Sequence, residues 1–158
     1  MSLQPPVGSD HQLARLLQIG VVLEEVVEAR AAKHSESDEI DDDVRQLLDE
    51  AAEESKTHRE RLDRLVDELD AETIPFDEIQ TLVEAQYEAD QDFDGVLYDQ
   101  LCNEETAYKF YDDLIDAIER SDAEFSIDRN RLLSVLREIR AEEKEGAEEV
   151  TKLMEQRE

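Results

Sequence analysis

Apolar residues recur along most of this chain at spacings of three and four, which is the period of an amphipathic α-helix. Four segments show the pattern: residues 10–35, 42–70, 92–121 and 126–154. Sustained alternation of apolar and polar residues is missing, and the whole chain has only 4 glycines, so hairpins and sheets are not expected. The pattern therefore predicts an all-α protein.

The connections between these segments indicate their topology. The first connection has about six residues and the last about five, and connections this short join antiparallel neighbours. The middle connection, residues 71–91, is long and contains an amphipathic stretch after Pro75. At ~1.5 Å per helical residue it can run most of the length of a bundle. The order short, long, short predicts a ferritin-like four-helix bundle whose second and third helices are joined by one crossover containing a short helix.

The ends of the segments also predict boundaries. Ser9 or Asp10 is expected to cap the first helix, and Asp90 or Asp92 the third. Residues 1–8 contain two of the three prolines and a glycine and are predicted to be a loose lead-in. A single domain is expected over residues 9–156, because a chain of 158 residues is too short for two comfortable domains.

Each predicted helix carries one apolar seam that is interrupted near its middle by a residue unusual for a core. The interrupting residues are Glu24, His58, Glu104 and Glu143. Helical rise places Glu104 and Glu143 at nearly the same depth in a bundle, whereas the depths of Glu24 and His58 match less closely. Glu28 lies one turn after Glu24 on nearly the same face and remains the alternative site residue of the first helix. Because a buried carboxylate is costly unless it is paired, protonated or bound to a metal, four such breaks predict a site inside the bundle.

The overall charge argues against some classes of binding partner. The formal net charge is -28, from 45 acidic and 17 basic residues, which argues against binding to nucleic acid or to an anionic membrane. Acidic residues are spread along the whole length and lysine is scarce, with 5 Lys against 12 Arg. Such surfaces are typical of cytoplasmic proteins from salt-in halophiles, where salt screens the self-repulsion.

Two further absences limit the chemistry. Cys102 is the only cysteine, so a disulfide within the chain and a cysteine-based metal site are excluded, and it is expected to pack as a small apolar group. The longest fully apolar run is Val21–Leu23, so neither a signal peptide nor a membrane span is expected. These features predict a cytoplasmic, halophilic protein.

Carboxylates and imidazole around one cavity suit iron, manganese or zinc. Two metal ions bridged by a glutamate can each take one electron, so such a pair can reduce peroxide or oxygen. Tyr108 and Tyr111 follow Glu104 by one and two turns, where they could hydrogen-bond a ligand or carry an electron.

Three segments of the sequence resemble the helices of one protein family. Residues 104–111 (EETAYKFY) place a Glu seven residues before a Tyr, which resembles the third-helix pattern of the rubrerythrin and ferritin-like superfamily. Residues 52–62 (AEESKTHRERL) and 140–150 (RAEEKEGAEEV) are similar to its second and fourth helices. The likeness extends over residues 10–156. It implies an iron-binding oxidoreductase or peroxidase that acts in oxidative stress, or a protein that handles iron.

That family holds two metal ions with one Glu from each of the first and third helices and a Glu-x-x-His motif from each of the other two. Carried over by position, the resemblance implies the following metal ligands: Glu24 or Glu28, His58, Glu104 and Glu143. Tyr111 is the implied catalytic residue, close to the ligands.

The chain departs from the family pattern at two positions. Ser55 stands where the second motif has its Glu, and Gly146 stands where the fourth has its His. Glu54 could substitute for the first, and water or Glu145 could fill the second place. The chain has no CxxC pair and hence no rubredoxin-like domain, so a redox activity requires an external electron donor.

A non-enzymatic alternative stays open. A bundle of the same descent that has lost its metal could serve as a binding or structural module, in the form of a homodimer.

The remaining histidines, His11 and His34, lie near helix ends and are expected at the surface. The cluster Arg59, Arg61 and Arg64 is expected to pair with neighbouring acids.

Overall fold

The computed structural model describes residues 5–72, 78, 81 and 95–157, and in that part of the chain it contains four α-helices and no strand. The helices are α1 (Asp10–Ser35), α2 (Asp42–Asp67), α4 (Val96–Glu119) and α5 (Arg129–Gln156). The prediction of an all-α, four-helix protein is confirmed. The crossover and its short helix fall almost entirely outside the described residues and stay a prediction.

Local capping explains where the helices begin. Ser9 caps α1 as predicted, since its side-chain oxygen accepts a hydrogen bond from the Gln12 N–H at 3.1 Å. The first residue of α4 is Val96, later than predicted, and the N-cap is Gly95 rather than Asp90 or Asp92. Gly95 has φ 116°, a conformation that a residue with a side chain rarely adopts. The sequence reasoning gave this glycine no role.

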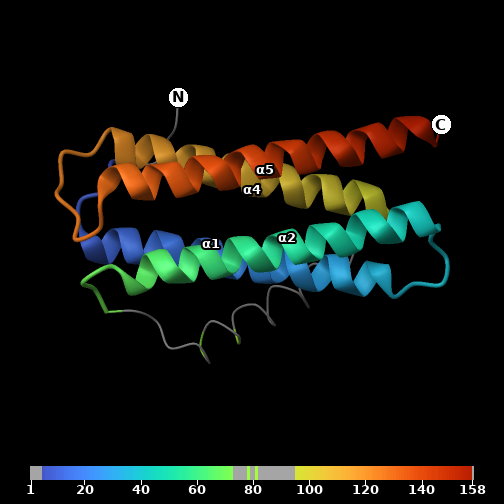
Figure 1. Cartoon of the computed structure of the whole chain (residues 1–158), viewed down its shortest axis with the longest axis horizontal. Coiled ribbons are helices and arrows are strands. Elements are labelled where there is room, and N and C mark those ends of the chain that lie inside the picture. The colour runs from blue at the N-terminus through green and yellow to red at the C-terminus, as the bar shows by residue number, and fades with distance from the viewer. Residues whose placement is uncertain (1–4, 73–77, 79–80, 82–94, 158) are drawn as a thin grey trace.

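The helices form two antiparallel hairpins that lie side by side (Figure 1). Residues 36–41 join α1 to α2, and residues 120–128 join α4 to α5. Between the hairpins, α1 contacts α4 through Glu24 and Tyr111, and α2 contacts α5 through Glu68 and Arg131, whose charged atoms are 2.6 Å apart. Each helix is therefore packed against a helix of its own hairpin and one of the other.

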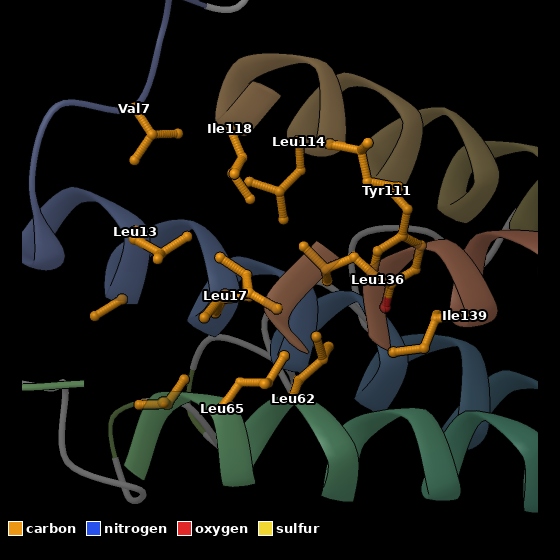
Figure 2. Packing of buried hydrophobic residues seen from close by; sticks show 14 of the residues in the cluster. Val7, Leu13, Leu17, Leu62, Leu65, Tyr111, Leu114, Ile118, Leu136 and Ile139 are labelled. Carbon is orange, nitrogen blue, oxygen red and sulfur yellow. The ribbon is translucent and has the colours of Figure 1, made fainter. Parts of the chain in front are cut away.

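The apolar core is divided into two clusters along the bundle. The larger cluster draws on all four helices, for example through Leu17, Leu62, Tyr111 and Leu136 (Figure 2). The smaller cluster contains Ala31, Val44 and Leu48, with half-buried side chains of α2, α4 and α5 packed against it. The boundary between the clusters is where the seam-breaking residues lie: in α2, His58 falls between Leu48 of one cluster and Leu62 of the other.

The segment before α1 is packed at its end. Val7 is fully buried, and its N–H donates to the Ala117 carbonyl at 3.2 Å while its own carbonyl accepts from the Ser121 hydroxyl. The prediction of a loose lead-in is therefore wrong at Val7, because the apolar side chain reaches the core and both backbone groups find partners. Among the helices described, none is both long and apolar enough to cross a membrane.

Candidate metal centre

One residue from each helix meets between the two apolar clusters. Glu24 and His58 are 0% exposed, Glu143 is 3% exposed and Glu104 is 5% exposed. These are the four seam-breaking residues, and their burial follows from the same helical spacing that buries their apolar neighbours. Three carboxyl groups and one imidazole thus share a layer of the bundle from which water is largely excluded.

His58 is at the centre of this layer. Its Nδ1 lies 2.9 Å from Glu143 Oε1 and 3.5 Å from Glu24 Oε1. Its Nε2 lies 2.7 Å from Glu142 Oε2 and 3.9 Å from Glu54 Oε1. One imidazole therefore faces four carboxyl groups, two on each side of the ring.

The carboxylates of Glu24 and Glu104 accept hydrogen bonds from uncharged donors. The Tyr111 hydroxyl donates to Glu24 Oε1 at 2.6 Å, and the Gln100 amide donates to Glu104 Oε1 at 2.9 Å. The other oxygen of each carboxylate, Oε2 of Glu24 and of Glu104, is buried without a hydrogen-bond partner. A buried acceptor left unpaired is costly, so both oxygens are poised to accept a ligand.

The pKa of His58 shows how the negative charge of the carboxylates in the layer is offset without a metal. Burial lowers the pKa of the imidazole, but hydrogen bonds to Glu143 and Glu24 and the charges of these acids outweigh it and raise the pKa to about 11. His58 is therefore an imidazolium near neutral pH, and both ring nitrogens donate. It supplies the positive charge that offsets the surrounding carboxylates.

The pKa values of two buried acids are raised as well. Burial raises the pKa of Glu143, with His58 lowering it and the charges of Glu24 and Glu104 raising it further. Burial also raises the pKa of Glu104, although its interactions with Glu143 and Gln100 lower it. Since like charges this close cannot all be ionised, these directions favour a protonated carboxyl group in the layer. The pKa of the Tyr111 hydroxyl is raised well above its usual value by burial and by Glu24, so it stays a donor.

Glu54 lies at the edge of the layer. Its side chain is 37% exposed, and burial together with Glu104 and Glu142 raises its pKa to about 7, with His58 acting against the shift. Glu54 therefore changes charge near neutral pH.

Three groups of side chains offer ligand atoms within 4.8 Å of one another: Glu24 with His58 and Glu143, Glu54 with His58 and Glu142, and Glu54 with Glu104 and Glu143. The first group is wholly buried. Oxygen ligands with one imidazole suit iron, manganese and zinc. Binding a cation would require His58 and any protonated carboxyl group of the layer to lose protons.

The structure brings most of the predicted site residues together and leaves one of them outside the site. Glu24, Glu54, His58, Glu104 and Glu143 converge, and Tyr111 contacts Glu24.

Glu28 does not belong to the layer. Its carboxylate faces Arg59 at 3.3 Å, because one helical turn carries it toward α2. Of the two first-helix candidates, Glu24 is the one in the layer.

The two departures from the family pattern have different surroundings. Ser55 is buried at 4% exposure beside His58. A Cβ at Gly146 would lie 2.6 Å from Glu104 Oε2, so the Glu104 carboxylate occupies the space that a side chain at this position would need. The absence of a histidine at 146 thus leaves no vacant hole.

Glu142 and Gln100 were missed by the sequence reasoning. Glu142 lies beside the seam position Glu143 rather than on the seam, yet it contacts His58 directly. Gln100 lies four residues before Glu104, the spacing at which side chains of one helix meet, and that spacing could have revealed it.

A second buried polar cluster joins α1 to α4. His34, predicted at the surface, is buried at 7% exposure, and its Nε2 lies 3.0 Å from Asp99 Oδ2. Arg30 donates to Asn103 at 3.1 Å and lies 3.5 Å from Asp99. The prediction for His34 is wrong because α4 covers the end of α1. Cys102, predicted to pack, is exposed.

Arg59 and Arg61 have the predicted acidic partners, and the prediction for Arg64 stays a prediction. Arg59 Nε lies 2.9 Å from Glu25 and its guanidinium also reaches Glu28, which links α1 to α2. Arg61 pairs with Glu138 and links α2 to α5. These pairs flank the layer on its outer side.

No family model, curated protein or solved structure matches this chain. Any functional assignment therefore depends on the geometry of the site.

Proposed function

We propose that this chain is a ferritin-like four-helix bundle, akin to the rubrerythrins, that binds iron in its core and reduces peroxide or oxygen there. Manganese or zinc would fit the same ligand types. The observation that carries the proposal is the pair of buried, unpartnered carboxylate oxygens, Glu24 Oε2 and Glu104 Oε2, in one layer with His58 and Glu143.

The donor set fits a divalent cation. Glu24, His58 and Glu143 would hold a first ion, and Glu54, Glu104 and Glu143 a second, with Glu143 common to both groups. The second group contains no imidazole, so we expect it to bind more weakly. Iron bound by these ligands would change oxidation state by one electron, and an external donor would return that electron.

The surrounding residues would prepare the ligands. The Tyr111 hydroxyl holds Glu24 by one oxygen and leaves the other free to bind, and Gln100 does the same for Glu104. His58 would release its Nδ1 proton on binding and would keep its Nε2–H, which donates to Glu142 at 2.7 Å. A hydrogen bond from a ligating histidine to a carboxylate fixes the ring orientation and raises its basicity.

The direction of the helices supports the ferritin-like topology. The pairings of Glu24 with Tyr111 and of His34 with Asp99 make α1 and α4 antiparallel. Since α1 and α2 form a hairpin, α2 and α4 run in the same direction (Figure 1). A connection between two parallel helices has to return along the bundle, as the proposed crossover would.

Metal binding by the wild type and two matched variants tests the proposal. Chelator-treated protein is titrated anaerobically with Fe(II), and bound iron is counted after desalting. We expect at least about one ion per chain for the wild type, a loss of at least tenfold in affinity for Glu24→Gln, and wild-type binding for Glu28→Gln. Iron-loaded wild type is then expected to consume hydrogen peroxide. No binding above background, or equal binding by both variants, contradicts the proposal.

The metal-free module is supported by one observation. His58 as an imidazolium already pairs with Glu143 and Glu142 and lies near Glu24, so the layer is partly satisfied without an ion. A wild type that binds no metal and unfolds at the same temperature with and without Fe(II) would favour that function.

A further inference from the structure

A solvent-facing cavity leads to the candidate metal centre from the side of the bundle. It has a volume of about 130 Å³ and lies where α2, α4 and α5 meet. Four carboxyl groups and one glycine among its lining residues matter here: Glu50, Glu54, Glu104, Gly146 and Glu149. Among the described residues that line it, none is a lysine, an arginine or a histidine. We call this cavity the acidic mouth.

The acidic mouth has an outer and an inner part. Glu50 and Glu149 are exposed, Glu54 is half-buried, and Glu104 is 5% exposed at its inner end. Glu104 and Glu54 both belong to a group that can hold a cation with Glu143. A continuous series of carboxyl groups therefore runs from solvent to the buried layer.

Glu104 provides the independent sign that a ligand comes through this opening. Glu104 lines the cavity, its Oε1 accepts from Gln100, and its Oε2, next to the cavity-lining Gly146, is buried and lacks a hydrogen-bond partner. An acceptor in this position is left unsatisfied by the protein and can be satisfied by a cation arriving through the mouth.

Gly146 makes this arrangement possible. A Cβ at position 146 would lie 2.6 Å from Glu104 Oε2 and 2.8 Å from Glu104 Cδ, so any other residue would displace the carboxylate. Glycine inside a helix is less stable than alanine. The glycine in α5 therefore keeps the inner end of the mouth occupied by Glu104 rather than by a side chain of its own.

We propose that the acidic mouth is the route by which divalent cations reach the buried ligands, with Glu50 and Glu149 collecting the ion and Glu104 receiving it. The proposal rests on the proposed metal-binding function and adds the path and the residues that serve it. Hard divalent cations prefer carboxylate oxygens, and a cleft lined by one sign of charge raises association rates by about 10- to 1000-fold.

Loading kinetics test the route. Metal-free wild type is mixed with Co(II) at low ionic strength in a stopped-flow instrument, and the visible absorption of the bound ion is followed. We expect Glu50→Gln/Glu149→Gln to slow loading by about tenfold while the final number of bound ions stays unchanged. The matched control is Glu53→Gln/Glu148→Gln, which removes the same charge from exposed positions on the same two helices outside the mouth.

A second variant tests the inner end. Gly146→Ala improves helix propensity, so the chain should still fold, but its Cβ moves Glu104 and is expected to slow loading as well. Equal loading rates for the wild type and both mouth variants, or equal slowing by the control pair, would overturn the route alone. A wild type that takes up no Co(II) overturns the metal-binding function and the route together.

Discussion

The hydroxyl of Tyr111 is predicted to stabilise the metal-free fold through a single hydrogen bond. Tyr111 is fully buried, and its hydroxyl donates to Glu24 Oε1 at 2.6 Å. Tyr111→Phe removes that donor and keeps the ring. The other oxygen of Glu24 has no partner, and His58 Nδ1, 3.5 Å from Oε1, is already engaged more closely by Glu143 at 2.9 Å, so no free donor replaces the hydroxyl.

The expected loss follows from the nature of the acceptor. Removing a hydrogen bond to a charged group costs about 1.5–3 kcal/mol. For a chain of this length, about 2 kcal/mol corresponds to a fall of about 4–8 °C in the unfolding temperature. We expect Glu24→Gln and Tyr111→Phe to be non-additive, because the two side chains form one interaction.

Urea and thermal unfolding of chelator-treated protein measure the effect. Tyr108→Phe is the matched control, since Tyr108 is half-buried one turn earlier in the same helix, and its change should stay within about 0.5 kcal/mol. A free energy of unfolding for Tyr111→Phe within about 0.5 kcal/mol of the wild type, or equal losses in both variants, would refute the reasoning.

Three further predictions concern pH, salt and the core. The pKa of Glu54 is about 7 in the folded protein, above its usual value of 4.5, so its proton stabilises the fold at low pH and that contribution is lost as the pH rises through 7; Glu54→Gln should flatten the fall in unfolding temperature between pH 5 and 8, and Glu53→Gln should not. With a net charge of -28, the unfolding temperature should rise with KCl as repulsion is screened, whereas an equal effect of sorbitol would contradict this explanation. Leu62 is fully buried, so Leu62→Ala should cost about 2–5 kcal/mol in urea unfolding, and a loss below 1 kcal/mol would contradict the packing described.

Much of the fold was accessible from the sequence because it depends on one period. The spacing of apolar residues placed the four helices, and a break in each seam marked Glu24, His58, Glu104 and Glu143 as buried. Sequence spacing cannot distinguish neighbouring turns of one face, so Glu24 and Glu28 stayed rivals until the position of Arg59 separated them.

Contacts between helices were the part that periodicity could not predict. Glu142 lies beside a seam rather than on it, and only the position of the His58 ring brings it into the site. His34 is near a helix end, which favours exposure, but packing of α4 buries it against Asp99. The role of Gly146 likewise depends on where Glu104 of another helix directs its carboxylate.

Anomalous diffraction from crystals of the chain loaded with Mn(II) or Fe(II) tests the metal centre most directly. The account predicts an anomalous peak in the bundle core, bound by His58 and by carboxylate oxygens of Glu24 and Glu143 and absent from crystals of Glu24→Gln. A core without a peak, or metal bound only to exposed acids of the surface, would contradict it.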